Sequence, residues 1–332
     1  MQASYEATTG KLYDPGLTLG RGTGRLVNIE SQMSYVEGFS NTNKLAMLRM
    51  SSMQAAIHSL ISSGDAAAAP GALTLFNNML MGDPGNTTPS VIQAVAQDSL
   101  SAFISALNTN YNGEYVFGGI NTSEQPLNFY TVGGKTGPSK VVKDTFDKFL
   151  DGRKPEDLTS EEMEEFIDGP FSNLFDEENF TKVFSNAQDG SIEKRILSNG
   201  EIVNIAASVN EKGFRNAMKN MVLVAEFGDI GLSKQESLYS KVRTSNDQTS
   251  TSSSTSEIIA IASRIGSAEV RVKTVTQRIE IQTDLLMKAK IDLIGVDSTG
   301  AVQKVQALEA MLNLSYTLTG RISQLSLVNY LR

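Results

Sequence analysis

The chain has 332 residues, of which 40% are hydrophobic and 20% are charged, and its formal net charge is −8. This length allows two domains with a substantial core, and the composition excludes disordered acidic, collagen-like and low-complexity chains. Cysteine does not occur and histidine occurs once, at His58, which excludes disulfides, thiolate zinc sites, iron–sulfur clusters, cysteine nucleophiles and histidine-rich metal sites. We therefore expect a protein that is not an enzyme and that uses no cofactor and no metal.

The first ten residues, Met1 to Gly10, contain neither the basic nor the apolar region of a signal peptide. No stretch of the chain approaches the roughly 18 to 20 apolar residues of a membrane span. We therefore expect no membrane association and, if the protein is exported, a route without a cleaved signal peptide.

A long amphipathic helix is predicted from Leu26 to Ile61. Positions separated by alternating steps of three and four residues form one stripe, which is the pattern of a coiled-coil seam. The stripe is polar at Ser40, Asn43 and Gln54, and such positions can fix the alignment of two helices at some cost in stability. The apolar anchors that we assign to this seam are Leu26, Ile29, Met33, Met47, Met50 and Ile57.

The middle of the chain is rich in aromatic residues, because residues 111–246 hold 15 of the 23 phenylalanines and tyrosines. Rings at this density are typical of a domain core. Thr159 and Glu162 have the spacing of a capping box, and Asn199-Gly200 is typical of a hairpin turn. We predict helices at 160–167, 212–227 and 232–242. We predict strands at 115–117, 180–184, 192–197 and 202–206, so the middle is a mixed α+β domain.

Eight consecutive serines and threonines, Thr249 to Ser256, indicate a linker. Ser254 and Glu257 have capping-box spacing, which predicts that a second long helix begins there. This helix carries a second seam of alternating steps of three and four residues. The anchors that we assign to it are Ile258, Ile261, Ile265, Val272, Ile279, Leu286 and Leu293. The spacing alone does not decide between parallel and antiparallel pairing with the first helix.

A third amphipathic helix is predicted from Ala301 to Leu331. Its apolar stripe is too broad for a single partner helix, and a stripe of this width would be exposed in a monomer. We expect it to face either another helix of the chain or other copies of the protein. The residues that we assign to this assembly or chaperone face are Leu308, Met311, Leu312, Leu318, Ile322, Leu325, Leu327 and Leu331.

These elements predict a mainly α fold with an α+β insertion, in which long helical arms from both chain ends form a coiled-coil bundle beside an inserted outer domain. We expect an N-terminal arm at 1–114, the inserted domain at 115–246, the linker at 247–256 and a C-terminal arm at 257–332.

Motifs that carry chemistry are weak in this sequence. Gly20 to Arg25 lacks the third glycine of a dinucleotide-binding turn, and Gly134-Lys135-Thr136 lacks the first glycine of a phosphate-binding loop. The carboxylates between Glu161 and Asp168 have no calcium-loop spacing, so they indicate a solvated helix face. The net charge and the lack of a basic cluster disfavour nucleic acid.

Three short segments resemble those of a known family. They are the C-terminal run Ser323 to Leu331, the segment Tyr115-Val116-Phe117-Gly118-Gly119 and the turn Ala7 to Lys11. Together they resemble the flagellin superfamily and, within it, the hook-associated proteins of the hook–filament junction. The likeness covers residues 1–120 and 257–332, and on this comparison the family's inner N-terminal helix is expected to be missing.

The resemblance implies a structural axial protein of the bacterial flagellum, exported unfolded through the flagellar type III channel and located outside the cell at the hook–filament junction. Its implied partners are other copies of itself, an adjacent hook-associated protein, flagellin, and an export chaperone bound to the C-terminal helix. Two alternatives stay open, namely a filament flagellin or flagellin-like variant, and a cell-surface binding module or adhesin whose middle domain holds a ligand.

Overall fold

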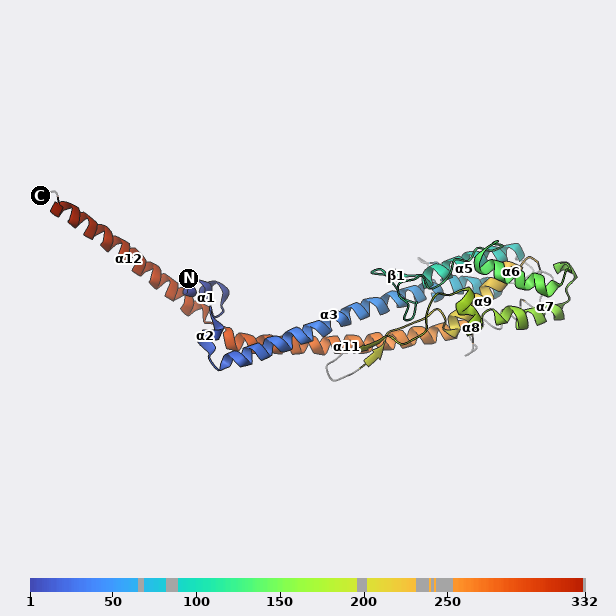
Figure 1. The fold of residues 1–332 in the computed structure, drawn as a ribbon, viewed down its shortest axis with the longest axis horizontal. Coiled ribbons are helices and arrows are strands. Elements are labelled where there is room, and N and C mark those ends of the chain that lie inside the picture. The colour runs from blue at the N-terminus through green and yellow to red at the C-terminus, as the bar shows by residue number, and fades with distance from the viewer. Residues whose placement is uncertain are drawn as a thin grey trace. The chain divides into compact units, whose positions relative to one another are not determined.

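The computed structural model describes residues 1–64, 69–81, 89–195, 202–230, 239, 242 and 253–330 of the chain. Packing divides the protein into two units. The terminal unit consists of residues 1–42 and 276–332, and the central unit of residues 43–275. Two long helices, α3 (Gly22–Ile61) and α11 (Ser254–Ile294), contribute to both units. The predicted fold class, mainly α with long helices from both ends of the chain, is confirmed (Figure 1).

The terminal unit holds α1 (Gln2–Thr9), α2 (Pro15–Leu19), α12 (Ser298–Tyr330) and the adjoining parts of α3 and α11. Helix α1 ends at Gly10, whose φ of 65° is a left-handed conformation that glycine adopts without strain. Helix α2 begins after Asp14, whose side chain accepts a hydrogen bond of 2.9 Å from the backbone N–H of Leu17. These two caps confine the N-terminal segment to two short helices.

The central unit contains the C-terminal part of α3, the N-terminal part of α11 and a set of shorter elements. Its helices are α4 (Ala72–Met81), α5 (Pro89–Leu107), α6 (Gly137–Leu150), η1 (Pro155–Asp157), α7 (Ser160–Phe166), the π-helical turn η2 (Ile167–Phe171), α8 (Glu177–Val183) and α9 (Lys212–Phe227). Its strands are β1 (Asn110–Tyr111), β2 (Glu114–Tyr115), β3 (Glu193–Arg195) and β4 (Ile202–Asn204), which form two antiparallel pairs, β1–β2 and β3–β4. Helix α5 packs against both α4 and α9.

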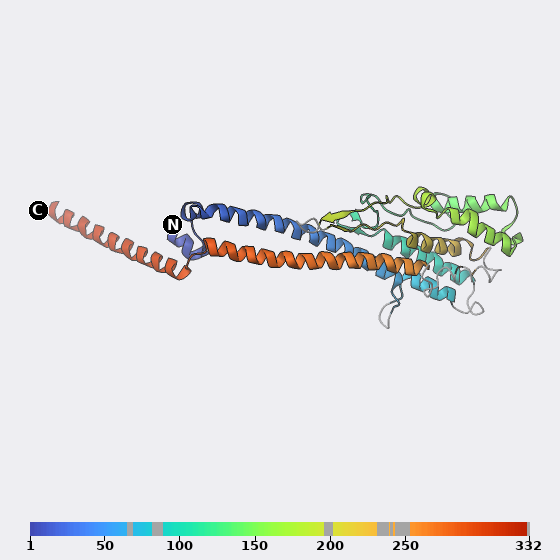
Figure 2. The same ribbon diagram turned by 90° about the horizontal axis from the view of Figure 1, so that it is seen from below.

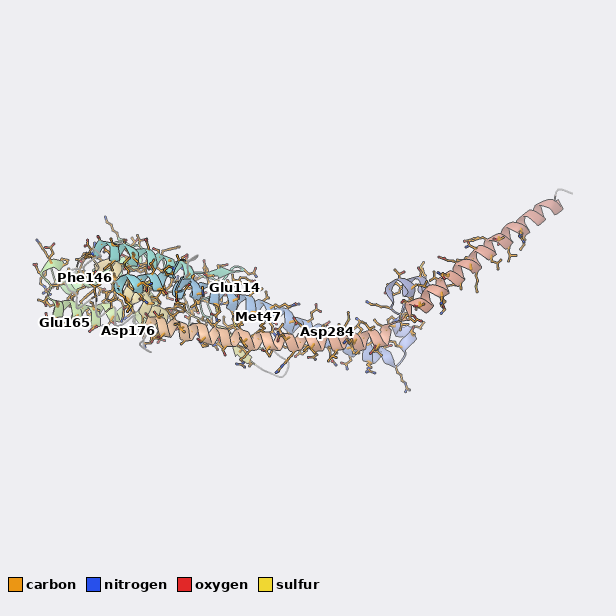
Figure 3. All side chains as sticks on the ribbon, turned by 180° about the vertical axis from the view of Figure 1, so that it is seen from behind. Met47, Glu114, Phe146, Glu165, Asp176 and Asp284 are labelled. Carbon is orange, nitrogen blue, oxygen red and sulfur yellow. The ribbon has the colours of Figure 1, made fainter. Side chains whose placement is uncertain are left out.

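Phenylalanine fills the core of the central unit, as the sequence predicts. Phe166 lies at the centre of one cluster, with ring centroids 5.0 Å from Phe146 and 5.6 Å from Phe227. Phe214 joins Phe103 and Phe117 in a second cluster. The cluster around Phe146, which is labelled in Figure 3, is built from side chains of α6, α7, η2 and α9. Edge-to-face ring contacts of this kind add about 0.5–1.5 kcal/mol per pair to the burial itself.

Several local predictions are confirmed and others are corrected. The helix at 212–227 has the predicted bounds, and both hydrogen bonds of the Thr159–Glu162 capping box are present. The strand predicted at 180–184 is wrong, because these residues lie in and after α8. Phe180 and Phe184 are four apart and both buried, so a helical face accounts for their spacing.

The strand predicted at 115–117 is also shorter than expected, because pairing ends at Tyr115. The strand predicted at 192–197 is observed as β3 for residues 193–195, and the strand predicted at 202–206 is observed as β4 for 202–204. The predicted turn at Asn199-Gly200 lies outside the described residues, as does most of the predicted helix at 232–242, of which only 239 and 242 are described as helical.

The start of α11 differs from the prediction by one residue. The hydroxyl of Ser253 accepts a hydrogen bond of 3.2 Å from the backbone N–H of Ser256, so Ser253 rather than Ser254 caps the helix. Residues 254–256, expected in the linker, form the first turn of α11, and Ser254 and Thr255 are buried. Short hydroxyl side chains can be buried here because they make hydrogen bonds to nearby groups. The amide of Asn77 also donates to the Thr255 hydroxyl at 3.3 Å.

The two long helices run antiparallel within each unit, and both Figure 1 and Figure 2 show them side by side. In the terminal unit, Glu30 of α3 pairs with Lys290 of α11 at 2.7 Å. In the central unit, the Gln54 side chain donates to the backbone carbonyl of Ala262 at 2.8 Å. The structure therefore settles the orientation that the seam spacing leaves open.

The segment Tyr115 to Gly119 enters the body of the central unit at a crowded point. Gly118 pairs with Ser208, and Gly119 pairs with Gln188. A Cβ atom at Gly119 would lie 2.0 Å from the carbonyl oxygen of Gln188, and the φ of Gly119 is +63°. Only glycine fits there, because both the approach of the second backbone and the left-handed conformation exclude a side chain.

Candidate assembly surface

The residues assigned to the two seams lie on the facing sides of α3 and α11. Nine of them are buried, and they are Leu26, Ile29, Met50, Ile57, Ile258, Ile261, Ile265, Val272 and Ile279. The other four are half-buried, and they are Met33, Met47, Leu286 and Leu293. Burial therefore weakens toward the end of α11 that lies in the terminal unit. Met47 of α3 and the solvent-facing Asp284 of α11 are labelled in Figure 3.

The polar positions of the first seam have different environments. Asn43 is fully buried, and Gln54 is half-buried and bonds to the backbone of α11. A Cβ atom at Gly266 would lie 2.8 Å from the Gln54 side-chain nitrogen, so the glycine leaves the space that the amide occupies. A polar side chain that fits opposite a glycine favours one alignment of the two helices.

An arginine joins α3 to the first hairpin of the central unit. The guanidinium of Arg49 pairs with Glu114 at 2.9 Å and donates to the backbone carbonyl of Tyr115 at 3.2 Å. Burial lowers the pKa of Arg49, and the charge and hydrogen bond of Glu114 act against that shift. Glu114, labelled in Figure 3, belongs to β2, which the chain follows shortly before Gly118 and Gly119. This contact holds the hairpin on the helical arm.

Helix α12 carries apolar side chains that nothing in its own unit covers. Five residues of the predicted assembly face are between 49% and 67% exposed, and they are Leu308, Met311, Leu312, Leu318 and Ile322. Leu325 and Leu327 lie in α12, but their side chains are outside the described residues, as is Leu331 as a whole. Leu314 and Tyr316 are also exposed. At about 100° per residue, the exposed apolar positions cover about 200° of the helix circumference.

The base of α12 is held by the N-terminal segment. Helix α1 packs along α12, and the backbone N–H of Leu12 donates to the carbonyl of Ile294 at 2.8 Å. The N–H of Val296 donates to the carbonyl of Gly10 at 2.9 Å, so the chain between α1 and α2 pairs with the corner between α11 and α12. This contact has no signal in the sequence, because the pairing residues are nearly 300 positions apart and share no pattern.

Groups suited to other chemistry are few in the part of the chain that the structure describes. No group of three or more His, Cys, Asp or Glu residues there has the arrangement of a metal site. His58 is exposed near the end of α3. Among the described helices, none combines the length and the hydropathy that crossing a membrane requires. The notable surface is therefore the apolar one on α12.

Comparison with known proteins gives matches at both ends of the chain. Residues 1–122 match the bacterial flagellin N-terminal helical region, and residues 248–331 match the bacterial flagellin C-terminal helical region. No curated protein matches the chain.

Among solved structures, the chain is similar to a putative flagellar hook-associated protein from Vibrio parahaemolyticus, with a TM-score of 0.51 and 8% identity over 82% of this chain and 97% of that chain. It is also similar to FlgL of Bacillus cereus, with a TM-score of 0.49 and 11% identity over 80% of this chain and 98% of that chain.

Long antiparallel helices from the two chain ends, with an exposed apolar helix beyond them, define a structural protein built for self-assembly. The two matched regions together span more than half of the residues, and the chain belongs to the flagellin superfamily. It is a structural protein of the flagellar axis, which lies outside the cell and assembles with other axial components.

Proposed function

We propose that this protein forms part of the junction between the flagellar hook and filament, and that α12 is the surface through which it joins the axial structure. The exposed apolar arc of α12 is the observation that carries this proposal. An arc of about 200° is too wide for one partner helix, whereas a helix that lines a tube has neighbours on several sides.

The division into two units fits a position on an axis. The terminal unit carries the exposed apolar surface, and the central unit has its own aromatic core. In an axial protein, the first unit packs among copies and neighbours, and the second faces solvent. The antiparallel seam of α3 and α11 then transmits torque between them. The proposal therefore includes two parts. One is the position of the protein in the axis, and the other is the role of the assigned seam residues in joining α3 to α11.

The proposed neighbours are other copies of this chain, a second hook-associated protein on the hook side and flagellin on the filament side. The likeness to the putative flagellar hook-associated protein from Vibrio parahaemolyticus supports a hook-associated role. Before assembly, an export chaperone covers the apolar face of α12, because an exposed surface of this kind favours aggregation.

The location is tested by tagging the central unit, within residues 43–275, and mapping the tag along isolated flagella by immunogold electron microscopy. We expect label in one narrow band between hook and filament. Label along the whole filament would identify a filament flagellin instead, and label confined to the cell body would contradict an axial role.

The role of α12 is tested with one charge at two positions. Ile322→Asp places a carboxylate within the apolar arc, whereas Gln306→Asp places it on the polar side of the same helix. We expect Ile322→Asp to abolish incorporation and Gln306→Asp to preserve it, since burying an unpaired carboxylate costs several kcal/mol per interface. Normal flagella in cells that produce only Ile322→Asp would overturn the proposal.

A further inference from the structure

A hollow of about 350 Å³ opens on the surface of the central unit beside the C-terminal half of α5. This is within the size range of small-molecule sites. One wall is formed by Ser101, Ile104 and Ser105 of α5 and by Asn108, which follows the helix directly and continues its spacing. The rest of the lining comes from Tyr115 of β2 and from the segment 125–130.

Phe129 stands at this hollow with 77% of its surface exposed. The backbone on both sides of Phe129 is held by hydrogen bonds and burial. The backbone N–H of Asn128 donates to the carbonyl of Phe184 at 2.9 Å, and the Asn128 side chain donates to the carbonyl of Val183 at 3.1 Å. Leu127 on one side is fully buried, and Tyr130 on the other side is buried and bonded to Glu226. The fold therefore holds Phe129 outward at no benefit to its own core.

The lining of the hollow carries no charge. Its eight residues are serine, isoleucine, asparagine, tyrosine, glutamine and phenylalanine, in a chain of which 20% is charged. An anion would need a cationic donor and a cation would need carboxylates, and the lining provides neither. The occupant that fits this lining is neutral.

The polar groups of the lining are left available. Among the described residues, the hydroxyls of Ser101, Ser105 and Tyr115 have no hydrogen-bond partner in the protein. The amide of Asn108 is oriented by a reciprocal pair of bonds with the Leu127 backbone, at 2.8 and 3.0 Å, and keeps one N–H free. The side-chain amide nitrogen of Gln125 donates to the carbonyl of Leu127 at 3.1 Å, and the side-chain oxygen of Gln125 remains available as an acceptor.

We propose that this hollow is a binding site for a neutral pyranose sugar. Such a ring has one apolar face of C–H groups and a rim of hydroxyls. The apolar face stacks on Phe129, where C–H groups meet the electron-rich face of the ring. The rim hydroxyls exchange hydrogen bonds with the serines of α5 and with Gln125. This site lies in the central unit and is independent of the proposed assembly through α12.

The test uses the full chain and a panel of neutral methyl glycosides of glucose, galactose, mannose and N-acetylglucosamine, with sialic acid as the charged comparison. Binding is followed by saturation-transfer NMR and calorimetry. We expect at least one neutral glycoside to bind saturably, with a Kd of about 1–10 mM. If no neutral glycoside binds in that range, or if sialic acid binds more tightly than all of them, the proposal is overturned.

Variants then place the sugar. Phe129→Ala is expected to weaken binding by about tenfold or more, and Phe129→Tyr to keep it within about threefold, because only the first removes the ring. Val91→Ala, also on α5 but outside the lining, is the matched loss of an exposed apolar side chain and should leave Kd unchanged. Circular dichroism confirms that each variant is folded. A Phe129→Ala protein that binds as tightly as the unchanged chain would place the sugar elsewhere and overturn the site.

Discussion

The two units of this protein bury different kinds of side chain. Every one of the largest fully buried side chains belongs to the central unit, and eight of these twelve are phenylalanine. The terminal unit depends instead on narrow aliphatic contacts such as Leu26 and Ile279, and it exposes large apolar residues along α12. Among the described residues, the central unit buries its aromatic rings within one chain, whereas the terminal unit leaves the apolar arc of α12 exposed.

This difference separates stability from assembly along one chain. The helices α3 and α11 pass through both units, so the same seam pattern lies beside a large aromatic core in one unit and near solvent in the other. A mutation in the central unit should therefore act on the unfolding of a cooperative domain. A mutation in the terminal unit should act mainly on local opening and on contacts with neighbours.

The largest effect is expected from emptying the aromatic core. Phe166→Ala removes a fully buried ring that contacts Phe146, Phe171 and Phe227, and should lower the free energy of unfolding of the central unit by about 3–5 kcal/mol. Urea unfolding followed by circular dichroism measures the change. Phe129→Ala removes the same ring at an exposed site and should cost less than about 0.5 kcal/mol. Equal losses for the two variants would mean that the ring cluster is not the core.

A charge placed at two positions of α11, one in each unit, tests whether the two units respond differently to the same change. Ile265 and Ile279 are both buried in the seam of α11, the first in the central unit and the second in the terminal unit. Ile265→Asp should lower the unfolding free energy of the central unit by about 3 kcal/mol or more, because it buries an unpaired carboxylate. Ile279→Asp should instead raise hydrogen exchange in residues 22–42 and 276–294 and leave the central unit unchanged.

The matched control is Ser267→Asp, which adds the same charge on the exposed side of α11 in the central unit. It should alter the unfolding free energy by no more than about 0.5 kcal/mol. If Ile279→Asp destabilised the central unit as strongly as Ile265→Asp, the protein would unfold as a single cooperative block, and the division into two units would have no energetic meaning.

The seams can be predicted from the sequence because the burial that they need is local and periodic. Each step of three or four residues returns to the same side of one helix, so Ile258, Ile265 and Val272 can be assigned without knowing the partner. The direction of pairing could not be read, because it depends on contacts such as Gln54 with Ala262, which are about 200 residues apart.

The central unit was harder to predict for the same reason. A run such as Phe180 to Phe184 is short, and a short apolar run fits a strand or a helix until its neighbours are known. The hollow beside Phe129 had no signal in the sequence at all, since its lining comes from α5, β2 and the segment 125–130, and none of these carries a recognisable motif. Such a site becomes visible only when the fold brings these pieces together.

A smaller effect is expected at the loop between Tyr130 and Ser139, which one carboxylate holds in place. Glu226 accepts hydrogen bonds from the Tyr130 hydroxyl at 2.9 Å, from the Ser139 hydroxyl at 2.8 Å and from the backbone N–H of Gly133 at 3.2 Å. Glu226→Gln turns one acceptor into a donor and should cost about 1–3 kcal/mol, measured by urea unfolding at neutral pH. Glu165→Gln, the same change at an exposed position of α7, is the control and should have no comparable effect on the loop.

The same contact predicts a dependence on alkaline pH. Burial, followed by the charge of Glu226 and its hydrogen bond, raises the pKa of Tyr130 above its ordinary value near 10. The unfolded chain therefore loses this proton first, so the stabilisation is complete below about pH 10 and declines as the pH rises further. Tyr130→Phe should remove that part of the decline, which unfolding curves at pH 9 to about 11 would detect. A decline identical in both proteins would assign it to other groups.

The smallest effect is expected at the ion pair between Glu30 and Lys290, whose side chains are both partly exposed. Glu30→Gln should change the stability of the terminal unit by less than about 1 kcal/mol, because water and salt screen the attraction. Glu37→Gln, at an exposed position of the same helix, removes an equal charge without breaking a pair and is the control. Hydrogen exchange at low and at about 1 M salt should show a difference between the two variants only at low salt. A difference that persists at high salt would mean that the pair is shielded from solvent and contributes more to the terminal unit than an exposed ion pair does.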